Sequence, residues 1–185
     1  MVFNGYLRTI DKWVLMGWLA FFILCACAKT VDPVPSWNFG DKAVQITYTA
    51  DKLLNSYDNK PRTLLLVVYQ LDNVNAFNRF SAYKEGLEKL LEAQNFDPSV
   101  MAVEKAFVEP ASTKTLVLNR AENAKWVGVV AGYFDLIPDK ASRVFEIPHS
   151  VKTTGAVFKK REAQIEALRV HLLLGPNTIQ EIKSP

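Results

Sequence analysis

Alternation of apolar and polar residues is the dominant pattern along most of the chain. In residues 43–50, Val44, Ile46 and Tyr48 fall on one side of an extended segment, and the residues between them are mostly polar. Successive side chains of a strand point to opposite faces, so this period of two predicts a strand with one buried face. Such a strand is expected in a sheet whose other face meets solvent.

Two further segments, 63–71 and 125–135, are apolar on both faces and predict central strands. In the second, Gly128 and Gly132 indicate close packing or a bulge. Shorter strands are expected at 103–109, 113–119, 142–148, 168–174 and 178–182. Together with 43–50 these make eight strands, spaced as in a mainly β, two-sheet β-sandwich.

Residues 74–94 depart from this pattern and predict a small helical insertion. Apolar residues recur there at roughly helical spacing, namely Phe77, Phe80, Tyr83, Leu87, Leu90 and Leu91. Ser81 is expected to cap a helix that runs through Ala93. We interpret the aromatic stripe as core packing against the sheet rather than as a ligand pocket. Residues 158–167 stay ambiguous, because their charges fit a helical turn although the segment runs into a strand.

The first 28 residues have the parts of a secretory signal peptide. A short segment with Arg8 and Lys12 precedes an uncharged apolar run that is too short to span a membrane. The run ends in Leu24-Cys25-Ala26-Cys27, which resembles the bacterial lipobox. That resemblance implies cleavage between Ala26 and Cys27, diacylglycerol on the Cys27 thiol and a further acyl chain on the new amine. The alternatives are an ordinary signal peptide and an uncleaved anchor.

The lipobox sets the expected domain boundaries and location. Residues 1–26 are expected to be the signal peptide, 27–42 the lipidated N-terminus and tether, and 43–185 the β-sandwich domain. Pro33 and Pro35 favour an extended tether, and Trp37 and Phe39 are expected where the chain first touches the core. Ala28 follows the cysteine, which by the sorting rule of lipoproteins implies the periplasmic face of a Gram-negative outer membrane.

Composition and charge exclude several classes of protein. The 22 basic and 19 acidic side chains give a net charge of +3, too small and too scattered for nucleic-acid binding. The apolar fraction of 49% argues against a disordered chain. After cleavage only Cys27 remains, so no intramolecular disulfide is expected to support the fold.

The sequence shows no constellation typical of catalysis. His149 and His171 have no Cys, Asp or Glu at metal-ligand spacing, so we expect no metal. No serine lies in a G-x-S-x-G turn, and no glycine-rich turn opens a helix for phosphate. We therefore expect a binding or scaffold protein without catalytic residues or cofactor, other than the acyl chains on Cys27. A periplasmic hydrolase remains an alternative, and it requires a histidine to meet a carboxylate or serine in space.

Several short motifs follow the lipobox in order: Leu53-Leu54-Asn55, Lys60-Pro61-Arg62, a strand ending in Tyr69-Gln70-Leu71, Phe77 and Phe80, Val108-Glu109-Pro110, and residues 126–133. Their order and spacing resemble the TssJ family, the outer-membrane lipoproteins of the type VI secretion system. The resemblance covers nearly all of the mature chain and is looser after about residue 136. It implies a transthyretin-like eight-stranded sandwich with an added helical piece.

The resemblance also implies a function and partners. TssJ proteins bind the periplasmic C-terminal domain of TssM, an inner-membrane protein partnered by TssL, in an assembly that holds several copies in a ring. The family's contact with TssM involves the loop between the first two strands. Its tip here has six residues: Asn55, Ser56, Tyr57, Asp58, Asn59 and Lys60. Loops on a rigid sandwich are usual binding elements, and tyrosine is enriched at interface hot spots.

Two other interpretations stay open at this point. The same loop is also explained as a solubilising hairpin with Leu53 and Leu54 folded onto the core. The competing function is that of a different outer-membrane lipoprotein, binding a small ligand or peptidoglycan. That function requires a concave apolar pocket with a few polar groups.

Overall fold

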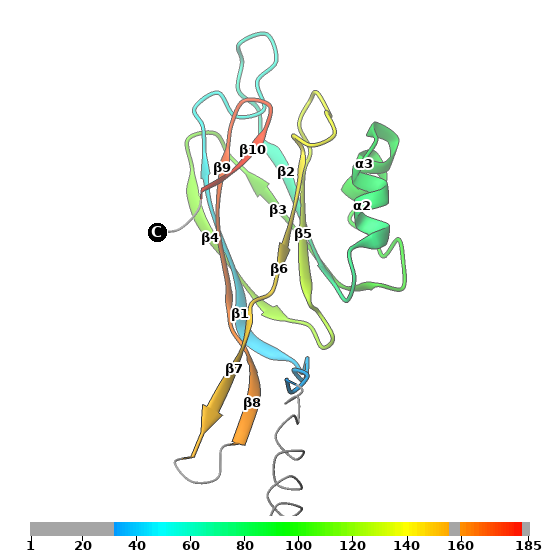
Figure 1. The fold of residues 1–185 in the computed structure, drawn as a ribbon. Helices are drawn as coiled ribbons and strands as arrows, with labels where there is room; N and C mark the ends of the chain where they lie inside the picture. Colours follow the sequence, from blue (N-terminus) through cyan, green and yellow to red (C-terminus); the bar gives the residue numbers. More distant parts are fainter. Residues whose placement is uncertain (1–31, 156–159, 183–185) are drawn as a thin grey trace, which may run out of the picture. The chain divides into compact units, whose positions relative to one another are not determined.

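Two four-stranded sheets face each other in the computed structural model, which describes residues 32–155 and 160–182 (Figure 1). In the first sheet the strands lie in the order β10 (Ile179–Ile182), β9 (Leu168–Leu174), β1 (Gly40–Ala50) and β4 (Thr113–Arg120). In the second the order is β3 (Val100–Val108), β2 (Leu64–Leu71), β5 (Trp126–Ala131) and β6 (Ser142–Glu146). The predicted mainly β, eight-stranded sandwich is thus confirmed. These strands belong to a unit spanning Pro33–Pro185, separate from Met1–Asp32.

A third sheet adds two strands that the sequence pattern did not separate. We call β7 (His149–Thr154) and β8 (Lys160–Ile165) the ribbon; within the described residues they pair only with each other. The ambiguous segment 158–167 therefore contributes a strand over its described part, not a helical turn. Most ribbon side chains are exposed, so neither strand needs the apolar alternation that reveals a half-buried strand.

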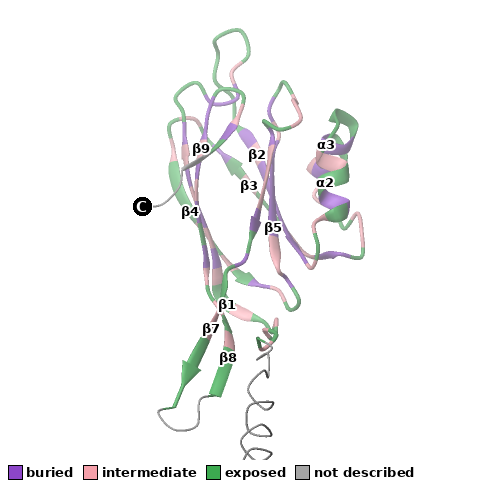
Figure 2. Ribbon diagram, viewed as in Figure 1, coloured by how far each residue is buried: buried purple, intermediate pink, exposed green. Residues whose placement is uncertain are grey.

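The first sheet is buried on its inner face only. Val44, Ile46 and Tyr48 of β1 are buried, as the alternation predicts, whereas the residues between them are half-buried (Figure 2). On the outer face the Thr47 and Thr115 hydroxyls lie 2.9 Å apart across β1 and β4. β1 lies in the middle of this sheet, antiparallel to β4 and parallel to β9.

The central strands of the second sheet, β2 and β5, are buried on both faces, because two short helices lie on its outer side (Figures 1 and 2). These are α2 (Asn75–Ser81) and α3 (Lys84–Leu91). The buried Phe77 ring of α2 lies against Gly128 of β5, where a Cβ atom would come within 2.6 Å of the ring. The close packing expected at Gly128 is therefore an aromatic ring seated on the strand.

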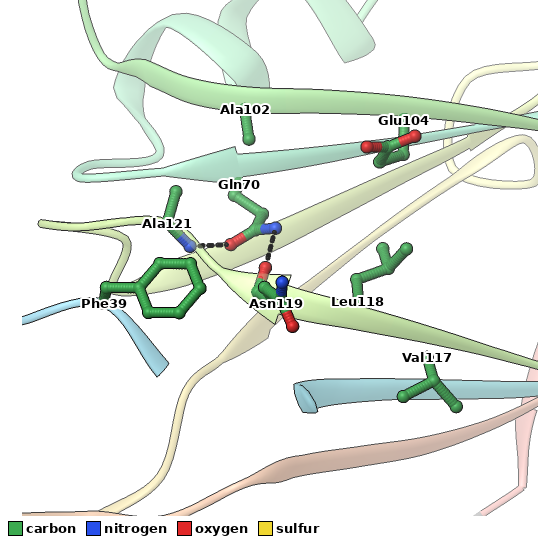
Figure 3. Close-up of a pocket in the computed structure, with 8 residues that line it drawn as sticks. All are labelled: Phe39, Gln70, Ala102, Glu104, Val117, Leu118, Asn119 and Ala121. Carbon is green, nitrogen blue, oxygen red and sulfur yellow. Dashed lines mark hydrogen bonds between the residues drawn. The ribbon is translucent and has the colours of Figure 1, made fainter. Parts of the chain in front are cut away.

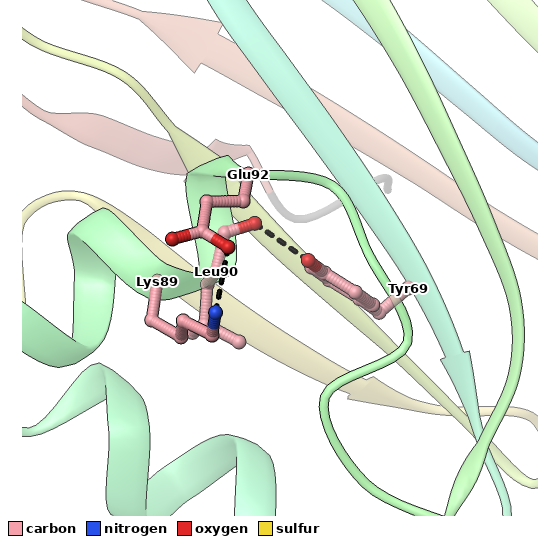
Figure 4. A network of polar contacts seen from close by, with 4 residues as sticks. All are labelled: Tyr69, Lys89, Leu90 and Glu92. Atoms are coloured by element: carbon pink, nitrogen blue, oxygen red, sulfur yellow. Dashed lines mark hydrogen bonds and ion pairs between the residues drawn. The ribbon is translucent and has the colours of Figure 1, made fainter.

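Tyr69 of β2 ties the sheet to the second helix. Its hydroxyl donates a hydrogen bond of 2.5 Å to the Leu90 carbonyl oxygen near the end of α3, next to the Lys89–Glu92 ion pair (Figure 4). Burial raises the pKa of Tyr69 to about 12. The hydroxyl therefore stays protonated and keeps donating across the physiological range.

The prediction of one helix capped by Ser81 was wrong. Ser81 ends α2 and its hydroxyl donates to the Asn78 carbonyl, while Tyr83 stands at the N-cap of α3 without a capping side chain. Gly86 of α3 lies so close to α2 that a Cβ atom there would come within 2.0 Å of the Phe80 carbonyl oxygen. The break lets the two helices fold back against each other while each buries apolar residues on the sheet.

Candidate functional site

Four connections meet at one end of the sandwich, which we call the loop end (Figure 1). They are the β1–β2 loop (residues 51–63) and the β3–β4, β5–β6 and β9–β10 turns. Backbone hydrogen bonds join them: Asp51 N–H donates to Leu174, Ala111 N–H donates to Asp51, and Ser56 N–H donates to Pro176. The β1–β2 loop is thus held by two neighbouring turns along its first half.

Asn55 fixes this loop from inside. It is 6% exposed, its side-chain NH₂ donates to the Thr63 carbonyl (3.1 Å), and its Oδ1 accepts from Phe134 N–H (2.6 Å). Its φ of 48° lies in the left-handed region, which asparagine tolerates better than most residues. Asn55 therefore holds both ends of the β1–β2 loop to the β5–β6 turn, and its side-chain oxygen and nitrogen are both engaged within the domain.

The remaining predicted loop residues lie at or near the surface. Tyr57, Asp58, Asn59 and Lys60 are exposed and Ser56 is half-buried. Tyr57 and Lys60 pair through reciprocal backbone hydrogen bonds of 3.1 and 3.0 Å around Asp58 and Asn59, which both have positive φ. Of the two leucines before this tip, Leu54 is buried and Leu53 is 44% exposed, so only Leu54 folds onto the core.

Tyr57 belongs to an exposed group that we call the aromatic cluster, formed with Phe134 and Arg62. The Tyr57 and Phe134 rings lie 4.1 Å apart between centroids, inclined by 34°. The Arg62 guanidinium lies 5.4 Å from the Tyr57 centroid and 5.8 Å from that of Phe134. Tyr57 is 42% exposed and Phe134 is 59% exposed. The two rings therefore form an apolar surface open to solvent, with the positive charge of Arg62 beside it.

The fold holds Phe134 in this exposed position from both sides. The preceding residue, Tyr133, is buried and its hydroxyl donates to the Thr178 carbonyl at 2.8 Å, while Phe134 N–H is bound by Asn55. Sequence reasoning missed Phe134 and Arg62 as members of this surface. Phe134 lies far from the loop along the chain, and only its position just after a buried strand hints at an exposed turn.

The N-terminal segment meets the sandwich at the opposite end (Figure 1). Trp37 packs against the core and its carbonyl accepts from Asn123 N–H at 2.7 Å. The buried Arg120 donates to the Asn38 carbonyl (2.5 Å) and places its guanidinium 5.8 Å from the Trp37 centroid. Of the two aromatic residues expected to reach the core, Trp37 does so, whereas Phe39 is 62% exposed. The eleven residues of β1 separate this end from the loop end by about 35 Å.

A groove of about 370 Å³ lies between the edges of the two sheets, lined by Phe39, Gln70, Ala102, Glu104, Val117, Leu118, Asn119 and Ala121 (Figure 3). Its volume suits a small ligand, but such a site also needs polar groups directed into it. The Gln70 amide is already used: it donates to the Asn119 carbonyl and accepts from Ala121 N–H, both at 2.8 Å. Gln70 thus joins the two sheets, and the groove offers little to orient a ligand.

Neither histidine belongs to a catalytic or metal-binding group within the described part of the chain. His171 Nε2 lies 3.2 Å from the Thr49 hydroxyl on the outer sheet face, and the His149 ring packs edge-on against Trp37 at 5.8 Å. The described residues contain no group of three or more His, Cys, Asp or Glu side chains placed to hold a metal ion. Their helices are also too short and too polar to cross a membrane. Ala26 and Cys27 lie outside the described residues.

The fold and this surface define a class: a β-sandwich domain that presents an exposed aromatic cluster on a firmly held loop end. A family model described as "Type VI secretion lipoprotein, VasD, EvfM, TssJ, VC_A0113" matches residues 42–171. The chain belongs to this family of type VI secretion lipoproteins. Among curated protein sequences, none matches the chain significantly.

Solved structures share the fold. Serratia marcescens Lip, described as a membrane bound component of the Type VI Secretion System, has a TM-score of 0.58 at 20% identity, covering 77% of this chain and 98% of its own. The T6SS lipoprotein TssJ1 from Pseudomonas aeruginosa gives 0.55 at 20% identity, with coverages of 82% and 98%. A chain in the structure described as the T6SS protein TssM C-terminal domain (869-1107) from EAEC gives 0.55 at 14% identity, with coverages of 76% and 98%.

Proposed function

We propose that this lipoprotein is anchored in the outer membrane through acyl chains on Cys27 and binds the periplasmic C-terminal domain of TssM through its loop end. It thereby links the outer membrane to TssM and its partner TssL in the inner membrane, with several copies arranged in a ring. The role is structural rather than catalytic. Family membership supports a role in type VI secretion. The exposed aromatic cluster is the observation that supports a partner-binding site at the loop end.

The aromatic cluster has the chemistry of a protein interface. Aromatic and arginine side chains are enriched at interface hot spots, and exposed apolar groups gain free energy when a partner covers them. No carboxylate among the described residues forms an ion pair with Arg62. The guanidinium is thus free to meet a carboxylate of the partner beside the two rings.

The position of the cluster also fits a link between two membranes. Residues 33–39 meet the sandwich at one end and the aromatic cluster lies at the other, so anchor and partner do not compete for space. This chain has the same fold as a chain in the structure described as the TssM C-terminal domain. That match supports TssM as the proposed partner.

Replacing Tyr57 with Ala tests the proposal. Because a buried hot-spot aromatic contributes about 2 kcal/mol or more, affinity for the TssM periplasmic domain should fall roughly 30-fold or more, measured by calorimetry with purified proteins. Tyr83→Ala is the matched control, since Tyr83 is 43% exposed and lies away from the loop end before α3. Wild-type affinity in the Tyr57 variant, or an equal loss in the Tyr83 variant, contradicts a binding site at the aromatic cluster.

A further inference from the structure

The ribbon is a second exposed element, and it projects from the end of the sandwich opposite the aromatic cluster (Figure 1). Its base is fixed to both sheets, because β6 leads into β7 and β8 leads into β9. Ile147 N–H donates to the Lys125 carbonyl and Glu166 N–H donates to the Pro148 carbonyl, each at 2.8 Å. The ribbon therefore extends from a firm root, although an isolated two-stranded ribbon is marginal in water.

The distal half of the ribbon is basic. Its six exposed residues form three cross-strand pairs: Lys152 with Glu162, Thr153 with Arg161, and Thr154 with Lys160. The one acidic side chain, Glu162, forms an ion pair with Lys160 at 2.6 Å, and Lys160 remains 76% exposed. Because side chains alternate along each strand, Lys152 and Lys160 lie on one face and Arg161 on the other. Basic side chains thus lie on both faces of the described distal half of the ribbon rather than on a single face.

The ribbon starts where the N-terminal segment meets the sandwich, since His149 at its base contacts Trp37. The six residues of β7 extend about 20 Å from this point. The ten residues from Cys27 to Trp37 span at most about 35 Å. The distal ribbon is therefore within reach of any membrane that holds Cys27.

We propose that Lys152, Lys160 and Arg161 bind the anionic phospholipid headgroups of the membrane to which the chain is anchored. This inference rests on the proposed anchoring at Cys27. Basic side chains are attracted to an anionic bilayer over about one Debye length. The tether holds the ribbon close enough to the bilayer to enter this range repeatedly. With a lipid anchor and a charged arm, the sandwich stands in one orientation, with the aromatic cluster facing away from the membrane.

The test uses the full lipidated chain in vesicles of phosphatidylcholine, with and without phosphatidylglycerol, each containing the same fraction of headgroup-nitroxide lipid. Cys25 leaves with the signal peptide and the Cys27 thiol carries lipid, so Thr154→Cys supplies a single site for a fluorophore. Asn177→Cys, in the exposed β9–β10 turn at the loop end, is the matched control. We expect several-fold stronger quenching at position 154 than at 177, in the anionic vesicles only, and loss of that difference at high salt.

Charge reversal sharpens the test. Lys152→Glu with Arg161→Glu should abolish the quenching at position 154, whereas Lys105→Glu with Lys114→Glu, on exposed positions of β3 and β4, should leave it unchanged. Equal quenching at 154 and 177, equal quenching in neutral and anionic vesicles, or indifference to the ribbon charges would each overturn the inference. Flotation of the vesicles reports on the anchor separately: a chain that does not float with them overturns the anchoring, whereas a floating chain without quenching overturns the ribbon contact alone.

Discussion

At the scale of single residues, Asn55 and Tyr69 show how buried polar side chains fix two parts of this domain, the β1–β2 loop and the helix α3. Each forms a hydrogen bond with a backbone group of another element. Asn55 accepts from Phe134 N–H of the β5–β6 turn, and Tyr69 donates to the Leu90 carbonyl of α3. A buried donor or acceptor that loses its partner costs more free energy than the bond itself contributes. Such positions are therefore sensitive to substitutions that change shape very little.

Replacing Asn55 with Ala should disturb binding and stability together. It removes the bonds to Thr63 and Phe134, so we expect a loss of about 1–3 kcal/mol in the free energy of unfolding, measured by urea titration. It also frees Phe134 from its place beside Tyr57, so affinity for the TssM domain should fall. Asn78→Ala, at an exposed position of α2 without a positive φ, is the control. Wild-type stability in the Asn55 variant would show that its two hydrogen bonds do not hold the loop.

Replacing Tyr69 with Phe should cost about 1 kcal/mol at neutral pH, because Leu90 keeps a second donor, Ala93 N–H. Its pKa is raised from 10.0 to about 12 by burial, so its contribution is complete below pH 10 and is lost as pH rises toward 12. The variant should therefore lose less stability than the wild type between these values, measured by urea unfolding at several pH values. Burial raises the pKa of Tyr48 and Tyr133 as well, so part of the alkaline loss remains.

At the scale of elements, the tip of the β1–β2 loop separates into a scaffold residue, Asn55, and a proposed contact part, residues 56–60. Replacing residues 56–60 with Gly and Ser, while keeping Asn55, should abolish TssM binding in pull-down with a circular dichroism melt close to that of the wild type. A replacement that also includes Asn55 should lower the melting temperature, because Asn55 is part of the scaffold. Retained binding by the shorter replacement would exclude the loop as the contact.

The strands of the sandwich could be predicted because each buries at least one face, and burial imposes a period of two or a continuous apolar run. The ribbon could not, since its exposed strands tolerate Lys, Arg and Glu at any position. The helical break at Ser81–Tyr83 depends on the close approach of Gly86 to Phe80, which is a tertiary contact. The spacing of the apolar residues stays nearly helical across the break, so the sequence pattern did not reveal it. For the same reason, sequence alone predicted Asn55 and Tyr57 alike as contacts, whereas the structure buries Asn55 and places Phe134, which the sequence did not suggest, beside Tyr57.

At the scale of the whole molecule, the proposed attachment and recognition sites occupy opposite ends of the sandwich. Replacing Cys27 with Ser should abolish type VI secretion in a competition or effector-release assay, because the sandwich then lacks its lipid anchor. The purified variant should still bind the TssM domain with wild-type affinity, since the loop end is unchanged. Normal secretion by this variant would contradict the anchoring role.

The central place of β1 has a mechanical consequence. Tension between a membrane anchor and a partner would enter near Trp37, just before β1, and leave through the β1–β2 loop just after it. That force runs along β1, whose hydrogen bonds to β4 and β9 stand across the direction of pull. Both ladders are loaded in shear, so their hydrogen bonds must yield together rather than one at a time, and the strand that joins the two ends resists being pulled out of the sheet.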